Sequence, residues 1–304
     1  MARLLGSQPG ASTGLRRMLE AGEMVLAPGC YDALGARLIE EAGFPAAYMT
    51  GFGSAASRLG RPDIGLMTLP EMVDNAHRIA QAVDIPVIAD ADTGYGNPIN
   101  VIRTVHEFEA AGVSAIHLED QLMPKKCGHM EGKQVVPAAE MAAKVAAAVA
   151  ARRSPEFLII ARTDARAVEG LEAALQRARI YREAGADALF VEAPQSEAEI
   201  EAVARAFPDV PLLFNYAEGG KTPAVTHAFL RGLGFKLVIF PLTILLAATA
   251  AIRSALARVK ADGTPLELVP SMLPFGEFLD FIGMPEIREL ERRFAQRSAD
   301  DAHG

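Results

Sequence analysis

The sequence is poor in the features that mark secreted, membrane or nucleic-acid-binding proteins. Only two cysteines, Cys30 and Cys127, occur among 304 residues, so there is no disulfide framework. No apolar run reaches the roughly 18 residues that a membrane span requires. The net charge is −8 with acidic and basic residues interspersed, so no basic face indicates a nucleic acid or a membrane surface. We therefore predict a cytoplasmic protein with a small-molecule partner.

One structural unit recurs along the chain, made of a short apolar run, a polar loop and an alanine-rich helical stretch that ends at glycine. The apolar runs lie at residues 25–28, 46–51, 86–92, 115–120, 157–164, 188–193, 211–216 and 236–241. Eight strands separated by helices predict an (α/β)8 TIM-type barrel, and near-continuous apolarity suits strands buried on both faces of a parallel sheet. An open doubly wound sheet is the alternative, but no Gly-rich dinucleotide motif follows the first strand.

The ends of the chain extend beyond this repeat. We predict a single barrel domain over 1–304, with 1–20 as an N-terminal arm and 264–304 as a C-terminal helical extension. Helical patterns after the eighth strand, at 243–259 and beyond, exceed what a barrel needs. Their apolar faces must be covered, and a neighbouring subunit can cover them. We therefore expect a C-terminal helix that is swapped between the subunits of a symmetric oligomer.

Polar residues follow the predicted strands at their C-terminal ends, where barrel enzymes place their chemistry. They are Asp90, Asp92, Glu119, Asp120, Arg162, Asp164, Glu192 and Asn215. Gathered carboxylates without a histidine cluster favour a hard divalent cation such as Mg²⁺. Each carboxylate taken singly could instead cap the next helix. The guanidinium of Arg162, in an otherwise apolar run, either forms a buried ion pair or recognises a substrate carboxylate.

The segment 125–129, Lys-Lys-Cys-Gly-His, follows the fourth predicted strand. Positive charge beside Cys127 favours a thiolate, and glycine lets the backbone approach a ligand closely. We therefore take Cys127 as a candidate reactive thiol. Cys30 follows the first strand and is expected to be structural.

These segments together resemble the isocitrate lyase and phosphoenolpyruvate mutase superfamily. Residues 125–129 match its lyase signature without a gap, and 90–94, 118–121, 161–165 and 191–194 match in order. The resemblance implies an (α/β)8 barrel, a homotetramer built as a dimer of dimers, and chemistry on 2-hydroxy or 2-keto carboxylates that depends on Mg²⁺, with Mn²⁺ as a possible substitute.

The resemblance also implies a role for individual residues. Backbone N–H groups of Thr50, Gly51 and Phe52 would bind one substrate carboxylate. The metal would be held by Asp92, helped by Asp90, Asp63 and Glu119. Cys127 would be the general acid on a loop, with Gly128 and His129, that closes over the site. Arg162, Glu192 and Asn215 would position the substrate, and Tyr48 would be either a base or a packing residue.

Two departures from the family bear on the substrate. Methylisocitrate lyases carry arginines where this chain has Leu246 and Phe275, which predicts a substrate without a third carboxylate. Residues 215–223 resemble the branch that cleaves 2-alkylmalates, so we expect retro-aldol cleavage of, for example, 2,3-dimethylmalate to pyruvate and propionate. The alternatives are methylisocitrate cleavage to pyruvate and succinate, carboxyvinyl-carboxyphosphonate phosphorylmutase activity, oxaloacetate hydrolysis or decarboxylation, and a carboxylate-binding protein without turnover.

Overall fold

The computed structural model describes residues 14–300, which fall into two compact units, 14–246 and 247–300. Helix α10 (Thr243–Asp262) crosses this division. The second unit therefore begins at residue 247, earlier than residue 264, where the C-terminal extension was expected to start. Of the expected N-terminal arm, residues 14–20 form helix α1, while 1–13 lie outside the described residues, as do 301–304 of the extension.

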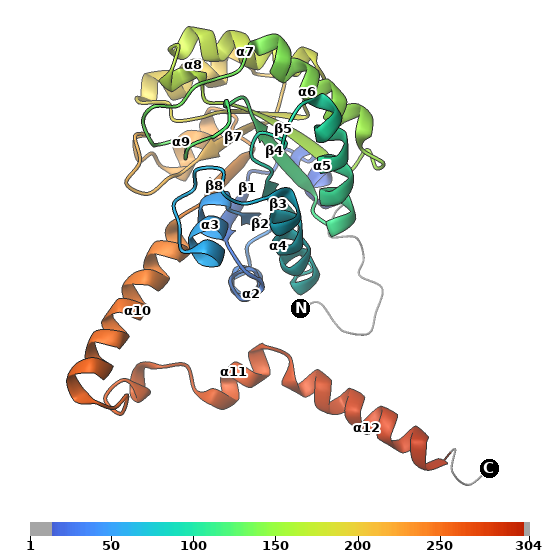
Figure 1. Ribbon diagram of the computed structural model, residues 1–304, viewed down its shortest axis with the longest axis vertical. Helices are drawn as coiled ribbons and strands as arrows, with labels where there is room; N and C mark the ends of the chain where they lie inside the picture. Colours follow the sequence, from blue (N-terminus) through green and yellow to red (C-terminus); the bar gives the residue numbers. More distant parts are fainter. Residues whose placement is uncertain (1–13, 301–304) are drawn as a thin grey trace. The chain divides into compact units, whose positions relative to one another are not determined.

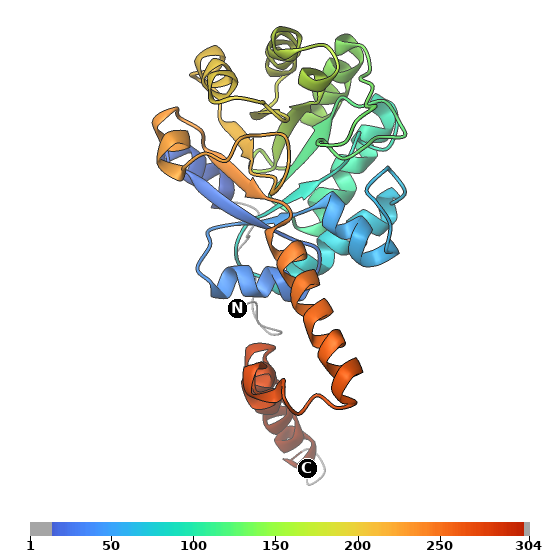
Figure 2. The same ribbon diagram turned by 90° about the vertical axis from the view of Figure 1, so that its left-hand side faces the viewer.

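The first unit confirms the predicted barrel. Eight parallel strands pair in sequence order and close on themselves through β1 and β8, with helices around them (Figures 1 and 2). The strands are β1 (Val25–Cys30), β2 (Ala47–Met49), β3 (Val87–Asp90), β4 (Ala115–Glu119), β5 (Leu158–Thr163), β6 (Ala188–Val191), β7 (Leu212–Asn215) and β8 (Leu237–Phe240). Seven of the expected apolar runs contain one strand each, and β1 begins with its run at Val25 but continues two residues beyond it, to Cys30.

The helices begin and end where the sequence supplies caps. Asn97 accepts hydrogen bonds from the first turn of α5, which begins at Pro98, and Gly112 ends that helix with a φ of 93°. The helices of the first unit are α1 (Gly14–Glu20), α2 (Ala33–Glu41), α3 (Gly51–Leu59), α4 (Leu69–Ala82), α5 (Pro98–Ala111), α6 (Ala138–Ala151), α7 (Leu171–Glu183), α8 (Glu197–Ala206) and α9 (His227–Gly232).

Two apolar clusters fix the barrel. The larger one packs the helices against the outside of the strands, and the smaller one fills the barrel interior. Leu15 and Leu19 of α1 join the interior cluster beside the first residues of the strands, among them Val25 and Leu237. Helix α1 therefore closes the N-terminal end of the barrel, and the C-terminal end is left for polar side chains.

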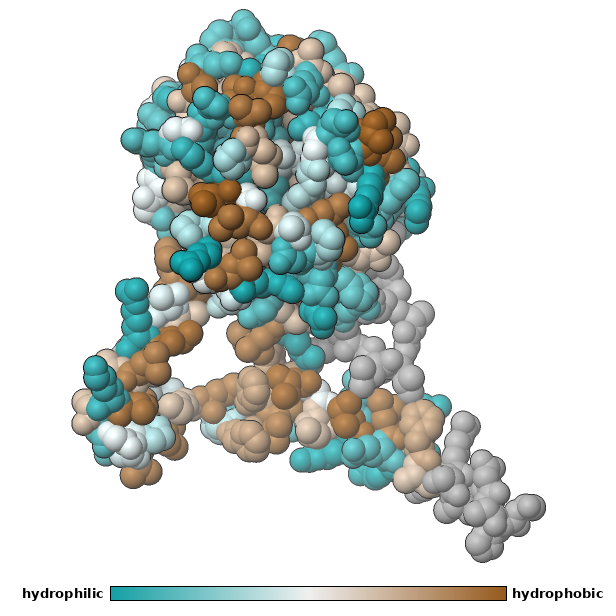
Figure 3. Space-filling view, viewed as in Figure 1, coloured by the Kyte–Doolittle hydropathy of each residue, from teal (hydrophilic) through white to brown (hydrophobic). Residues whose placement is uncertain are grey.

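The second unit contains most of α10, followed by α11 (Phe275–Phe281) and α12 (Met284–Asp300). Several of its apolar side chains are exposed, including Ile252, Leu256 and Phe275, and Figure 3 shows brown side chains along it. Among the described helices, none combines the length and apolarity that crossing a membrane requires.

Candidate active site

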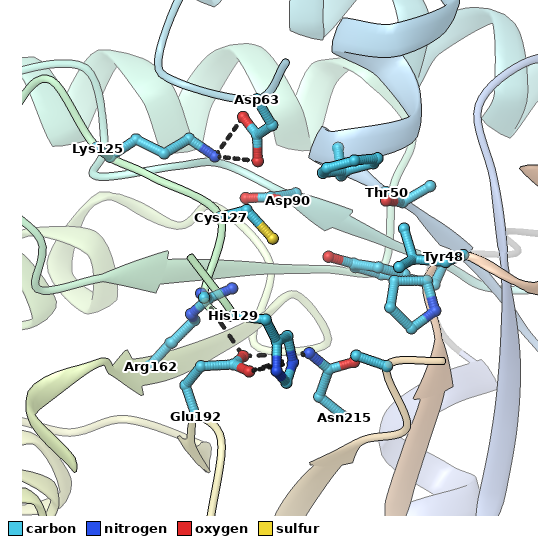
Figure 4. Close-up of a pocket in the computed structure, with 15 residues that line it drawn as sticks. Tyr48, Thr50, Asp63, Asp90, Lys125, Cys127, His129, Arg162, Glu192 and Asn215 are labelled. Atoms are coloured by element: carbon cyan, nitrogen blue, oxygen red, sulfur yellow. Dashed lines mark hydrogen bonds and ion pairs between the residues drawn. The ribbon is translucent and has the colours of Figure 1, made fainter. Parts of the chain in front are cut away.

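A cavity lies at the C-terminal ends of the barrel strands, and it gathers most of the predicted site residues (Figure 4). It is lined by Tyr48, Thr50, Phe52, Asp63, Asp90, Lys125, Cys127, Gly128, His129, Arg162, Glu192, Asn215, Ala217, Pro241 and Leu242. The predicted residues Gly51, Asp92 and Glu119 are buried close to this lining and contact its members, as described below.

A buried lysine lies among the carboxylates of Asp63, Asp90, Asp92 and Glu119, which we call the carboxylate cluster. The Lys125 ammonium is 2.7 Å from Asp63 and 2.6 Å from Asp92, and its side chain is only 2% exposed. Burial, together with Asp90 and Asp63, raises the pKa of Asp92 to about 6, although Lys125 opposes the shift. Sequence reasoning did not assign Lys125 a role of its own. The only available signal was its place beside Cys127.

The chemistry of this cluster fits a hard cation, with one condition. Its donors are carboxylate oxygens, and Glu119 Oε1 is buried with no hydrogen-bond partner among the described residues. Asp92 has a φ of 48°, a strained conformation for a residue other than glycine. In the part of the chain described, however, no group of three or more such side chains is already arranged around a metal position. A divalent ion therefore requires Lys125 to move away from Asp92 or share it.

The first turn of α3 borders the cluster. Thr50 is the N-cap of this helix, and its hydroxyl accepts a hydrogen bond from Gly53 N–H at 3.2 Å. A Cβ at Gly51 would lie 2.3 Å from Asp90 Oδ2, so only glycine allows this approach. Helix N-termini present free N–H groups and attract anions. The expected binding site for a substrate carboxylate, at residues 50–52, is thus next to the carboxylate cluster.

Arg162 is held by several carboxylates. Its Nε and a terminal nitrogen donate to Asp164 at 2.8 and 3.1 Å, and it lies 3.3 Å from Glu119 and 3.5 Å from Glu192. The expected ion pair therefore forms, while Arg162 also lines the cavity. Asn215 Nδ2 donates to both oxygens of Glu192, at 3.3 and 3.2 Å. These contacts fix the Glu192 carboxylate at one wall of the cavity.

Cys127 lies on a loop, residues 122–134, whose ends are joined by a bridge between Gln121 and Val135. We call this segment the Cys127 loop. Burial, with Glu192 and Asp63 nearby, raises the pKa of the Cys127 thiol. The expectation that flanking cations favour a thiolate is therefore wrong, because Lys125 turns toward the carboxylates. A thiol that keeps its proton is suited to act as an acid.

His129 secures the same loop over the cavity. Its Nε2 lies 3.0 Å from Glu192, and its Nδ1 accepts a hydrogen bond from the backbone N–H of Lys221 at 3.1 Å. A Cβ at Gly220 would lie 2.6 Å from the His129 ring, so the two loops pack closely. Although burial opposes the shift, Arg162 and His129 lower the pKa of Glu192.

Tyr48 is buried, and its hydroxyl lies 2.9 Å from Nε2 of His117. Burial, with Asp90, raises the pKa of Tyr48 well above its usual value, which disfavours the phenolate that a base would require. His117 lies inside β4 with no exposed surface, and sequence reasoning missed it because it sits within an apolar run.

One side of the cavity is apolar. It is formed by Phe52, Ala217, Pro241 and Leu242, of which only Phe52 was predicted. Leu246 is 48% exposed and is not part of the lining, although its N–H bonds to the Leu242 carbonyl one helical turn earlier. Phe275 lies in the second unit and is 77% exposed.

The sequence and the fold both match known proteins. The model of the phosphoenolpyruvate phosphomutase family matches residues 15–260. A 2,3-dimethylmalate lyase from Eubacterium barkeri is 47% identical over 281 residues, covering 92% of this chain and 97% of the relative. The structure of oxaloacetate acetylhydrolase in complex with the inhibitor 3,3-difluorooxalacetate aligns with a TM-score of 0.88 at 39% identity, covering 94% of this chain and 97% of that one.

A second solved structure is relevant to the carboxylate cluster. Phosphonopyruvate hydrolase in complex with oxalate and Mg²⁺ aligns with a TM-score of 0.85 at 34% identity, covering 94% of this chain and 99% of that one. Family model, relative and structures agree over nearly the whole described barrel. This chain is therefore an enzyme of the phosphoenolpyruvate mutase and isocitrate lyase superfamily.

Proposed function

We propose that this enzyme is a carbon–carbon lyase that cleaves a 2-alkylmalate, for example 2,3-dimethylmalate to pyruvate and propionate. The observation that carries the proposal is a single cavity lined by the Cys127 thiol, by Arg162 and Glu192, which lie 3.5 Å apart, and by apolar side chains on one side. The named 2,3-dimethylmalate lyase, 47% identical, supports the same substrate class.

The two substrate carboxylates have two complementary positions. One accepts hydrogen bonds from the N-terminal turn of α3, at Thr50, Gly51 and Phe52. The other lies against Arg162, whose fork already faces Glu192 and Asp164. The alkyl groups then face Leu242 and the apolar residues beside it, where a third carboxylate would be desolvated without a partner.

Bond cleavage in this arrangement needs no external reactant. The 2-hydroxyl loses its proton, the C2–C3 bond breaks, and C2 becomes the carbonyl carbon of pyruvate. The electron pair passes to C3 as the enolate of its carboxylate. Cys127 Sγ then donates its proton to C3 and yields propionate. The proton lost at oxygen passes to solvent, and a solvent proton restores the Cys127 thiol. The two products together therefore contain all the atoms of the substrate, and the enzyme is unchanged.

We propose Mg²⁺, or Mn²⁺ in its place, as the cofactor, held by Asp92 with Asp90, Asp63 and Glu119. When bound, the ion would supply positive charge that stabilises the developing charge on the 2-oxygen. The roles of the protein side chains are separate from that of the metal ion. His129 and Glu192 hold the Cys127 loop over the cavity and keep water from the enolate.

We also propose a homotetramer, a dimer of dimers with an exchanged C-terminal helix. An apolar groove on the barrel unit supports this assembly. It is lined by Pro28, Leu38, Ile39, Ala42, Phe44, Phe240, Thr243 and Ile244. The exposed apolar side chains of the second unit, such as Ile252 and Leu256, are suited to cover such a surface on another copy. The molar mass of the protein in solution, measured by light scattering after size-exclusion chromatography, tests this assembly, and the mass of a monomer would contradict it.

The proposed reaction is tested by coupling pyruvate release to lactate dehydrogenase in the presence of Mg²⁺. The enzyme is offered 2,3-dimethylmalate and 2-methylisocitrate separately, with Cys127→Ser as the control. We expect faster turnover of dimethylmalate and a loss of about 100-fold or more in the variant. Preference for methylisocitrate would mean that the apolar side does not exclude a third carboxylate. Turnover of neither substrate would contradict the proposal.

A further inference from the structure

Lys133 is a second buried lysine of the Cys127 loop, and the reaction described above does not use it. Its side chain is 1% exposed, and its ammonium donates to the carbonyl oxygen of Gly128 and lies 3.0 Å from Asp164 Oδ1. A buried ammonium is costly without such partners. The loop carbonyl and the Asp164 carboxylate are therefore tied together through one charged group.

Asp164 in turn fixes Arg162. Both carboxylate oxygens of Asp164 accept from the Arg162 guanidinium, and Oδ1 is shared between Arg162 and Lys133. The Asp164 backbone N–H donates to Asp120 at 2.9 Å, which holds this residue in place. Any displacement of Lys133 consequently acts on the orientation of the arginine.

Gly128 packs directly against the same arginine. A Cβ on Gly128 would lie 2.7 Å from a terminal nitrogen of Arg162 and 2.6 Å from Glu192 Cδ. The Gly128 carbonyl lies one residue beyond Cys127, so a bond that holds this carbonyl also restrains the backbone that carries the Cys127 side chain. The chain of contacts thus runs from the thiol through Gly128, Lys133 and Asp164 to Arg162.

We propose that Lys133 is a positioning residue that locks the Cys127 loop against Arg162, so that the acid and the carboxylate-binding arginine are brought into place together. The inference deepens the proposed function, since it assigns a role in the same site. When the loop closes, Gly128 supplies the second acceptor for the Lys133 ammonium, and this favours closure. An open loop leaves Lys133 with Asp164 alone.

Alkylation of Cys127 by iodoacetamide, followed by intact mass, reports closure without turnover. Cys30 has no exposed surface, so Cys127 is the thiol that reacts. The rate is measured without ligand and with Mg²⁺ plus oxalate, in wild type, Lys133→Met, Lys133→Arg and Lys236→Met. Lys236, the residue before β8, is the matched control, because its ammonium also donates to a backbone carbonyl, that of Gly22.

We expect Mg²⁺ and oxalate to protect Cys127 in wild type and Lys236→Met, and Lys133→Met to react at least about tenfold faster than wild type under these conditions. Lys133→Arg, which keeps the charge and the donors, should regain part of the protection. Equal alkylation rates in wild type and Lys133→Met, with and without oxalate, would overturn the proposal. Where Lys133→Met does not fold, Lys133→Gln is compared in the same way. Failure to cleave any malate would instead contradict the proposed function.

Discussion

The Lys125 ammonium lies 2.6 Å from Asp92, so a cation of the Cys127 loop occupies the middle of the carboxylate cluster. Because Asp63 contacts the same ammonium at 2.7 Å, Lys125 neutralises the two carboxylates that a divalent ion would also use. In the proposed metal site, loop position and cation binding would therefore depend on the same oxygens.

Lys125→Met is expected to destabilise the enzyme in the absence of divalent ions, because it leaves buried carboxylates without their partner. A loss of about 3 kcal/mol in the free energy of unfolding is typical of a broken buried ion pair. Millimolar Mg²⁺ should raise the melting temperature of this variant more than that of wild type. Lys144→Met, at a buried lysine whose ammonium donates to the Thr93 carbonyl, is the control. Equal Mg²⁺ shifts in Lys125→Met and wild type would be inconsistent with shared oxygens.

Gly51→Ala is expected to displace Asp90, since the new Cβ would meet Asp90 Oδ2 at 2.3 Å. Overpacking of this kind costs about 1–3 kcal/mol, and activity should fall as well. Gly232→Ala, at a helical glycine where the new Cβ would meet nothing within 4 Å beyond its chain neighbours and its own helix backbone, should leave stability within about 0.5 kcal/mol. Urea unfolding of the two variants measures the difference, and similar losses in both would show that the Asp90 contact is unimportant.

His117 should make stability depend on pH. Burial lowers its pKa to about 4 in the folded enzyme, against about 6.5 when unfolded. The unfolded chain therefore binds the proton first, and stability falls as the pH drops from about 6.5 toward 4. Between pH 7 and 4.5 wild type should lose about 2 kcal/mol more than His117→Asn. Urea unfolding at both pH values checks this, and parallel losses would argue against a neutral buried imidazole.

Leu242→Ala should weaken recognition of the alkyl group, because the apolar side of the cavity loses a contact. A fall of at least about tenfold in kcat/KM for 2,3-dimethylmalate is expected, in keeping with the value of a methylene group or two in an apolar pocket. Leu246→Ala is the comparison, since that side chain is outside the lining. The reverse result, with only Leu246→Ala impaired, would favour the residue inferred from the sequence.

The barrel could be predicted because its signals are local. Each apolar run is long enough for a strand, and glycines such as Gly112 end the helices that follow. The strand ends then placed Asp90, Arg162 and Glu192 at one end of the barrel, as observed. This part of the site follows from topology alone.

The rest of the site depends on the directions in which side chains point, which cannot be read from the sequence. Lys125 and Lys126 are adjacent, and only the folded loop reveals that the first of them turns toward Asp92. Leu242 and Leu246 are one helical turn apart and equally apolar, yet only Leu242 lines the cavity. The role of His117 could not be predicted for a similar reason, because its apolar neighbours in β4 do not indicate that a polar ring lies inside the barrel.

The most direct test of the proposed lyase is to follow cleavage of 2,3-dimethylmalate in D₂O by NMR. Cys127 exchanges its proton with solvent, so protonation of C3 should give pyruvate and propionate in equal amounts, with one deuterium on C2 of propionate. Cys127→Ser should slow formation of both products together. If the enzyme forms no pyruvate from this substrate but releases oxalate from oxaloacetate or rearranges a phosphonate, the proposed carbon–carbon lyase activity on alkylmalates is wrong.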